Sequence, residues 1–295
     1  MEQLERRAEA ISGEFNSQDV ANTLWSYATM GTKPGERMMG QLERRAEAIS
    51  GEFNSQDIAN TLWAYATMGT MPGERLMVQL ERRSEAISGE FNSQGIANTL
   101  WAICFFCVQF NLSLRFCCSL SSSLLPMDFV DQKHLCQLHQ VFISCDMIEG
   151  LHTDLSVSVQ TLKETLGPSC QAAFIGVSVH PSASQQEVSD TLRGMGLSVE
   201  NEFQCPKSGY SIDMRVHDMR VNTKSSTWAA EGWAVEFDGP SHFLTCRLPV
   251  GGTLMKRRHL ELLGYTVVSL PFWEWGQLTG CDERKEYLRG KLHIA

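Results

Sequence analysis

The hydrophobic and polar positions of the N-terminal third recur with a period of 38 residues. Residues 1–30 return at 39–68 with three changes, and a further copy begins at Met77 and runs to Ala102. Internal repeats of this length are typical of stacked arrays, because a single unit cannot bury its own apolar face. We therefore expect each copy to pack against the next.

The first half of each period predicts one amphipathic helix. Leu42, Ala46 and Ile49 fall at i, i+4 and i+7, which places them on one side of a helix. Gly51 follows them and is expected to end this helix as its C-cap.

The second half of each period predicts another helix. Asn54, with Asp57 three residues later, is typical of an N-cap, and Ile58, Leu62 and Ala66 then share one face. Each period is thus a helical hairpin, and residues 1–102 predict an α-solenoid with an extended surface for binding.

The repeat resembles a known family in its length and in the core FNSQDIANTLWAYATMG at 53–69. It is similar to the octotricopeptide repeat of algal organelle RNA-binding proteins. The resemblance implies that polar residues on one helix of each hairpin read RNA bases. Arg44, Arg45, Arg82 and Arg83 lie on the polar face of the first helices and are RNA-binding candidates, with a solvated helix face as the alternative.

The third copy loses the repeat pattern after Ala102, and an apolar and serine-rich stretch occupies residues 103–126. Three interpretations stay open: a membrane span, a translated intron or gene-model error, and a buried divergent helix. Gln109, Asn111 and Arg115 in the middle of the stretch argue against the membrane span.

The chain begins inside a repeat, because Met1 aligns with Met39 and Met77. It opens without a targeting signal, and we expect it to be a fragment of a longer protein.

From Met127 onward the pattern becomes that of a mixed domain. A helical connecting region is expected over 127–196, with helices at 135–147, 157–166 and 184–195. An α/β domain is expected over 197–295, with strands at 198–204, 210–216, 233–237 and 265–270 and a helix at 253–263. The predicted fold class is therefore an α-solenoid followed by an α/β domain.

The end of the chain carries the most informative motif. WAVEFDGPSHF at 233–243 and GGTLMKRRHLELLGYTVVSLPFWEW at 251–275 resemble the RAP domain, with a core at about 233–291. RAP domains end octotricopeptide-repeat proteins and the Fas-activated serine/threonine kinase family of mitochondrial RNA factors. The resemblance implies a fold of the restriction-endonuclease-like type and a location in the mitochondrion or chloroplast.

The same block contains candidate catalytic carboxylates. Asp213, Glu236 and Asp238 resemble an endonuclease pattern that holds Mg²⁺ and orients a water for attack on a phosphodiester, and His242 matches the histidine of very-short-patch-repair-like enzymes. Residues two apart on a strand point to the same face, so Glu236 and Asp238 would share an ion with Asp213 if the two strands are adjacent. The alternative is an inherited fold without catalysis, in which Asp238 accepts backbone hydrogen bonds in a turn.

Basic and aromatic residues of this block are candidates for RNA contact. Lys256, Arg257 and Arg258 lie near an expected helix N-terminus, where charge and free N–H groups attract phosphate. Trp273 and Trp275 are candidates for stacking on bases. The alternatives are a solvated helix end and core aromatics.

Composition limits the class of protein. Charged residues make up 20% and hydrophobic residues 43% of the 295 residues, which excludes a disordered tail and a collagen. The net charge of −9 excludes a strongly basic nucleic-acid coat and predicts weak, salt-sensitive RNA affinity. Ten cysteines without regular spacing suggest reduced thiols rather than a disulfide framework or a zinc site.

Together these patterns predict an RNA-binding protein that acts in organellar RNA processing, stability or translation. The expected partners are single-stranded RNA, either organellar mRNA or rRNA, and other RNA-processing proteins, without a membrane. A Mg²⁺-dependent endoribonuclease and a noncatalytic protein–protein adaptor are the alternatives, and no cofactor is expected unless the carboxylates are catalytic.

Overall fold

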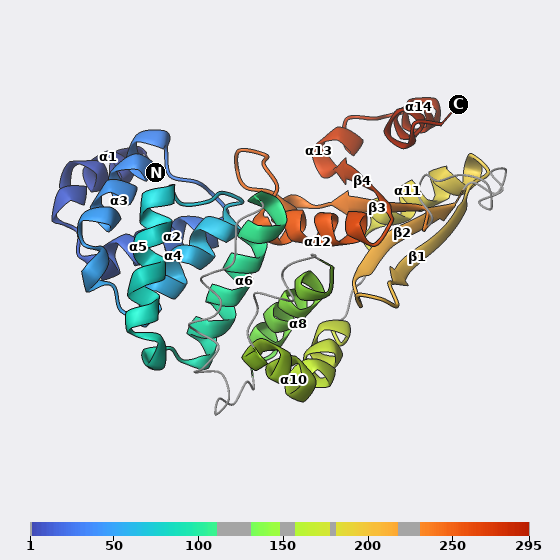
Figure 1. The fold of residues 1–295 in the computed structure, drawn as a ribbon. Helices are drawn as coiled ribbons and strands as arrows, with labels where there is room; N and C mark the ends of the chain where they lie inside the picture. Colours follow the sequence, from blue (N-terminus) through green and yellow to red (C-terminus); the bar gives the residue numbers. More distant parts are fainter. Residues whose placement is uncertain (1, 111–130, 148–156, 178–180, 218–230, 295) are drawn as a thin grey trace. The chain divides into compact units, whose positions relative to one another are not determined.

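The computed structural model describes residues 2–110, 131–147, 157–177, 181–217 and 231–294. Two compact units contain them: Met1–Ala173 with Phe243–Met255, and Phe174–His242 with Lys256–Ala295. The first unit is helical and the second contains a four-stranded sheet (Figure 1), which confirms the predicted fold class of a helical array followed by an α/β domain.

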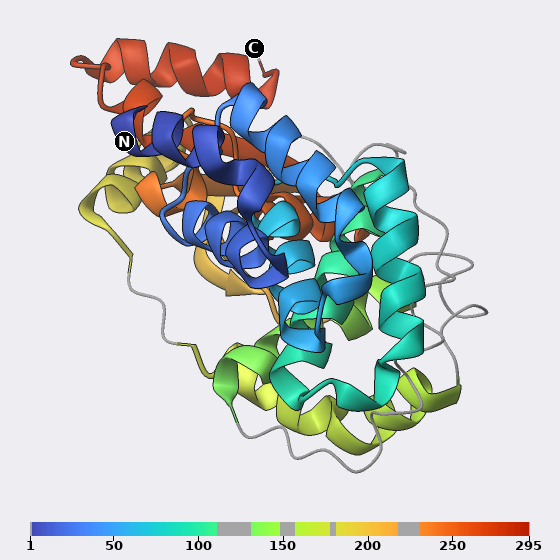
Figure 2. The same ribbon diagram turned by 90° about the vertical axis from the view of Figure 1, so that its left-hand side faces the viewer.

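Each period in the first unit is a helical hairpin. The helices are α1 (Glu2–Ile11), α2 (Ser17–Thr29), α3 (Glu36–Ala48), α4 (Ser55–Thr67), α5 (Glu74–Ala86) and α6 (Ser93–Phe110). The hairpins follow one another in chain order, from dark blue to green in Figures 1 and 2. The second helices α2, α4 and α6 pack more extensively on one another than the first helices do, so they form the dense layer of the stack.

The second helices start as the sequence predicts, but the first helices end differently. The Asn54 side chain accepts a hydrogen bond from the Asp57 N–H at 2.8 Å, and the Asp57 carboxylate accepts one from the Asn54 N–H at 3.3 Å, which confirms the N-cap. The prediction of Gly51 as a C-cap is wrong. Helix α3 ends at Ala48, and Gly51 lies in a 3₁₀ turn, where no left-handed residue is needed to reverse the chain.

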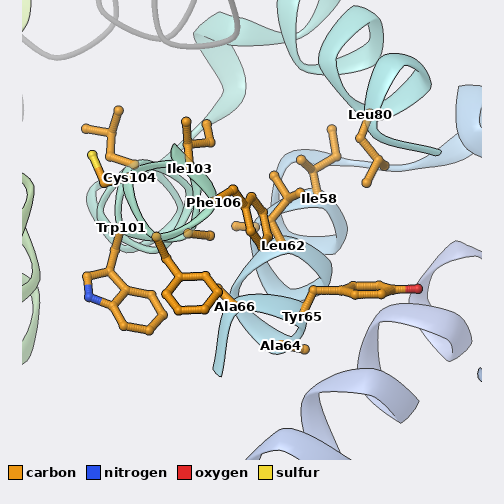
Figure 3. Close-up of a cluster of buried hydrophobic side chains, with 14 of the residues drawn as sticks. Ile58, Leu62, Ala64, Tyr65, Ala66, Leu80, Trp101, Ile103, Cys104 and Phe106 are labelled. Atoms are coloured by element: carbon orange, nitrogen blue, oxygen red, sulfur yellow. The ribbon is translucent and has the colours of Figure 1, made fainter. Parts of the chain in front are cut away.

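Apolar side chains fill the space between neighbouring hairpins. Figure 3 shows Ile58 and Leu62 of α4 facing α6, with Phe106 between the two helices and Leu80 of α5 alongside. All four side chains are fully buried. The stripe predicted from the period therefore forms the core of the array.

Helix α6 extends eight residues beyond Ala102, through residues 103–110, and most of this extension is buried. This part of the doubtful stretch is a buried divergent helix, and residues 111–126 lie outside the described residues. Among the helices described, none combines the length and the apolar character needed to cross a membrane.

The repeat register continues beyond this stretch. Leu24, Leu62, Leu100 and Leu138 are spaced 38 residues apart, and each is at most 1% exposed. Leu138 belongs to α8 (Gln132–Met147), which packs on α6 as α6 packs on α4. Helix α8 therefore extends the stack of second helices, although the repeat sequence itself is lost after Ala102.

Helix α10 (Val157–Ile175) runs beside α8 in the opposite direction. Lys163 pairs with Asp146, and Gln132 Nε2 donates to the carbonyl oxygen of Ala173 at 3.3 Å. The predicted helix at 157–166 is too short, because the helix continues through Pro168.

The segment Phe243–Met255 packs with the helical unit although the RAP-like block contains it. The Thr245 N–H donates to the carbonyl oxygen of Gly31 at 2.8 Å, and Gln109 Nε2 donates to the carbonyl oxygen of Leu254 at 3.2 Å. Gly251 lies against the backbone of α4, where an added Cβ would stand 1.8 Å from the carbonyl oxygen of Ala66.

The sheet of the second unit has the order β1–β2–β3–β4 (Figure 1). Its strands are β1 (Ser198–Gln204), β2 (Ser211–His217), β3 (Trp233–Asp238) and β4 (Thr266–Pro271). The first three are antiparallel in sequence order, and β3 and β4 are parallel, joined by α12 (Gly251–Leu262). The predicted strands are confirmed to within one residue at each end.

The two faces of the sheet differ in chemistry. Val235 and Val268 lie on an apolar face with residues of α11 (Ala183–Gly194) and α14 (Cys281–Leu292). The opposite face carries carboxylates and meets side chains of α12. Sequence reasoning missed the short α13 (Phe272–Trp275), because four residues are too few to show a helical period, and it missed α14, because that segment contains few apolar residues.

Candidate functional site

The structure brings the three predicted carboxylates together on one face of the sheet. Asp213 lies on β2, and Glu236 and Asp238 lie on the neighbouring strand β3. All three are buried, with at most 9% of each residue exposed. Asp213 accepts a hydrogen bond from the Phe237 N–H at 2.8 Å, so it also helps to join the two strands.

Glu236 is paired with a cation from the connecting helix α12. Lys256 Nζ lies 2.6 Å from Glu236 Oε2, whereas Glu236 Oε1 is buried without a hydrogen-bond partner. Burial raises the pKa of Glu236 to about 7, although Lys256 opposes this shift. Burial by itself lowers the pKa of Lys256, but Glu236 and Asp213 outweigh it and raise that pKa, which keeps the ammonium charged.

Asp238 is the centre of a second set of contacts. Arg257 Nη2 donates to Asp238 Oδ2 at 2.7 Å, His242 Nδ1 lies 2.8 Å from Oδ1, and the Ser269 hydroxyl donates to Oδ2. Burial alone would raise the pKa of Asp238. The hydrogen bonds from His242 and Ser269 and the charge of Arg257 reverse that shift and hold the pKa below its ordinary value.

As arranged, these residues do not fit a divalent cation. Mg²⁺ prefers free carboxylate oxygens and water in an octahedron. Here Lys256 and Arg257 neutralise Glu236 and Asp238, and of the two carboxylates only Glu236 Oε1 lacks a partner. Across the described residues, no three His, Cys, Asp or Glu side chains are grouped as a metal site requires.

The three basic residues predicted to contact phosphate differ in their exposure and in their partners. Lys256 and Arg257 point at the carboxylates, with only 23% and 19% of their side chains exposed. Arg258 is exposed and lies 3.3 Å from Glu261. Of the three, only Arg258 remains a candidate for binding phosphate, because the charges of Lys256 and Arg257 are already paired within the fold.

The two candidate tryptophans also differ. Trp275 is 2% exposed and belongs to the apolar core of the second unit, so its indole cannot stack on a base in this fold. Its indole N–H donates to Glu187 at 3.3 Å, and Arg284 lies over its ring. Trp273 is partly exposed on α13 and keeps its predicted role as a candidate.

The arginines of the first helices have two distinct roles. Arg45 Nε donates to the carbonyl oxygen of Phe15 at 2.6 Å, and Arg83 Nε donates to that of Phe53 at 2.8 Å. These contacts tie one hairpin to the one before it, which sequence reasoning missed. Arg44 and Arg82 are exposed and remain candidates for contact with RNA.

Ser269 is a further polar residue of this site that sequence reasoning missed. It lies on β4 opposite Glu236 in the parallel pairing and contacts both Asp238 and Arg257. The sequence did hold one indication of such a residue, because Glu236 and Asp238 lie on an otherwise apolar strand. Buried charges require polar partners from neighbouring elements.

The fold and the site define a class of protein: a helical-repeat array joined to an α/β domain with an internally neutralised carboxylate face. Residues 235–291 match the RAP domain. Residues 1–166, more than half of the chain, match the family described as RNA-editing substrate-binding complex 6 protein, and the chain belongs to this family.

Shorter similarities connect the chain to organellar proteins. It is 35% identical over 109 residues to the RAP domain-containing protein, chloroplastic, of Oryza sativa subsp. japonica, which covers 37% of this chain and 15% of that protein. It is 43% identical over 60 residues to FAST kinase domain-containing protein 3, mitochondrial, of Homo sapiens, which covers 20% and 9%. The chain therefore spans only a small part of the length of these relatives.

Proposed function

We propose that this chain is an organellar RNA-binding protein whose helical repeats bind single-stranded RNA. Its RAP domain contributes to that binding and does not cleave the RNA. The proposed setting is RNA processing, stability or translation in a mitochondrion or chloroplast. Other RNA-processing proteins are proposed as partners.

The combination of two modules on one chain carries this proposal. The family of residues 1–166 has RNA editing in its description, which supports an RNA-associated role. The chain's relatives with a RAP domain or a FAST kinase domain are described as chloroplastic or mitochondrial, which supports the organellar setting. Stacked hairpins provide the regular surface that repeat proteins use to bind an extended polymer.

The internal pairing of the carboxylates supports binding over cleavage. A cleavage site needs carboxylates that are open to a metal ion and to a water. In this chain Lys256 pairs with Glu236 and Arg257 pairs with Asp238. The same pairing removes two cations from the surface, so the affinity for RNA is expected to be weak, with a salt dependence set by the few basic side chains that remain exposed.

The test is equilibrium binding of the full chain to a panel of labelled single-stranded RNAs, followed by fluorescence anisotropy. Saturable binding at low salt that weakens between about 50 and 200 mM salt supports the proposal. Duplex RNA of the same composition is the control for binding by charge alone. Absence of binding to every RNA at low salt, by a chain shown to be folded, contradicts the proposal and favours the protein–protein adaptor.

The Mg²⁺-dependent endoribonuclease stays a prediction that the same samples can test. RNA recovered after incubation with Mg²⁺ is expected to be intact. Cleavage that is lost in a folded Asp238→Asn variant, with binding retained, would establish the nuclease instead. Glu236→Gln is the second variant, because Asp238 has several structural partners and its replacement risks unfolding.

A further inference from the structure

A stripe of uncharged polar and aromatic side chains runs along the second helices of the first two hairpins. We name it the Asn–Trp stripe; it consists of Gln18, Asn22, Trp25 and Thr29 on α2 and Gln56, Asn60, Trp63 and Thr67 on α4. Steps of four, three and four residues place each set on one side of its helix. Trp25 is 43% exposed, so the stripe is open to solvent on α2 and partly covered on α4.

The two halves of the stripe belong to neighbouring helices. Helices α2 and α4 pack directly, and the Ser17 hydroxyl donates to the Asp57 carboxylate between their first turns at 2.9 Å. Packed helices are about 8–10 Å apart. The stripe therefore offers the same chemical group again at each step of the stack.

The third hairpin shows which chemistry this surface accepts. The equivalent residues Asn98 and Trp101 are buried against α8. Gln137 Nε2 donates to Asn98 Oδ1 at 3.0 Å, and Trp101 Nε1 donates to Gln140 Oε1 at 2.7 Å. A planar amide with a donor and an acceptor thus satisfies both positions, and the edge of a nucleobase presents the same pair of groups.

The electrostatics of the stripe suit a polyanion. No charged residue lies between Val20 and Met30 or between Ile58 and Met68. The ammonium of Lys133 on α8 lies 5.2 Å from the ring centroid of Trp63. The stripe thus has one cation above its aromatic row and no carboxylate within it to repel a phosphate.

We propose that the Asn–Trp stripe is the base-contacting surface of the repeats, an inference that rests on the proposed binding of single-stranded RNA. A base stacks on the exposed indole of Trp25, and the Lys133 ammonium over Trp63 binds the adjoining phosphate. The amide of Asn22 bonds to a base edge, and Asn60 does so through its N–H groups, because its Oδ1 already accepts from Gln56 Nε2 at 2.8 Å. Helix α8 closes the stripe at the third hairpin. Because the first two hairpins carry identical stripe residues, we expect both to favour the same type of base.

The experiment compares RNA binding by Trp25→Ala and Asn22→Ala with binding by the unaltered chain. Stacking on one indole contributes about 1–3 kcal/mol, so Trp25→Ala is expected to weaken binding roughly 5- to 150-fold. Trp25→Phe should retain most of the affinity, because it keeps an aromatic face. Val78→Ala removes an exposed apolar side chain on α5, away from the stripe, and should bind like the unaltered chain.

The outcomes separate this inference from the proposed function. If the unaltered chain binds RNA and Trp25→Ala and Asn22→Ala bind equally well, the stripe is not the binding surface and the proposed function stands. A loss confined to the double variant Arg44→Ala and Arg82→Ala would place RNA on the first helices instead. If homopolymer RNAs are bound no better than mixed sequences, reading of one base type is contradicted.

Discussion

The two units stabilise their buried polar groups in opposite ways. In the helical unit, hydrogen bonds between neighbouring hairpins recur with the repeat: Arg45 bonds to Phe15 as Arg83 bonds to Phe53. In the sheet unit two buried ion pairs that occur once, Glu236 with Lys256 and Asp238 with Arg257, join β3 to α12. When a contact is repeated, several copies contribute to the free energy of unfolding. A buried ion pair that occurs once has no second copy to compensate for its loss.

This difference predicts where single substitutions are most harmful. Removing one partner from a buried ion pair leaves the other charge without compensation, and such losses exceed those of a surface pair several-fold. Removing a cap or a bond from one repeat leaves the other repeats intact, so its cost is confined to one hairpin.

The largest effect is expected from Lys256→Met. The variant leaves the buried Glu236 without its cation, and we expect a loss of about 3–5 kcal/mol in the unfolding free energy of the sheet unit at pH 8. Hydrogen exchange of the β3 amides measures it. Arg258→Met, at an exposed pair, is the matched control and should change that free energy by less than about 1 kcal/mol. Equal exchange in both variants would contradict a stabilising Glu236–Lys256 pair.

Leu62→Ala tests the helical unit. Leu62 is fully buried between hairpins (Figure 3), and its truncation is expected to destabilise that unit by about 2–5 kcal/mol, measured by urea unfolding. Val78→Ala at an exposed site provides the baseline. A loss no greater than the baseline would show that the hairpins do not stack as described.

The acidity of Glu236 gives a pH-dependent test. Because the pKa of Glu236 is raised from 4.5 to about 7, its stabilising contribution is fully present below about pH 4.5 and is lost as pH rises through 7. This single group accounts for at most about 3 kcal/mol. The difference in unfolding free energy between the unaltered chain and Glu236→Gln, measured from pH 4.5 to 8, should follow this curve; a pH-independent difference would contradict the raised pKa.

The smallest effect is expected at a helix cap. Asn54→Ala removes the bond to the Asp57 N–H and should cost about 1 kcal/mol in urea unfolding. Asn16→Ala removes the equivalent cap of the preceding hairpin and should cost a similar amount. Unequal costs would show that the hairpins are not energetically alike.

Local features of the fold could be predicted from the sequence, and distant ones could not. The cap at Asn54 and the strand at 233–238 follow from residues a few positions apart. The packing of α8 on α6 was missed because its one mark in the sequence is Leu138, which lies three periods of 38 residues after Leu24.

The candidate site shows the same limit. The spacing of Glu236 and Asp238 predicts a shared face, but it does not show that Lys256 and Arg257 point back onto that face. That pairing depends on the crossover from β3 through α12 to β4, which sets the helix over the sheet. Exposed basic residues and buried ion-pair partners look identical in a sequence.

RNA binding without cleavage is tested most directly by a single titration of labelled single-stranded RNA with the full chain in Mg²⁺ at low salt, followed by anisotropy and then by gel. We expect saturable binding of RNA that is recovered intact, with Trp25→Ala binding more weakly than Val78→Ala. A folded chain that leaves the RNA unbound, or that cleaves it, would contradict RNA binding without cleavage.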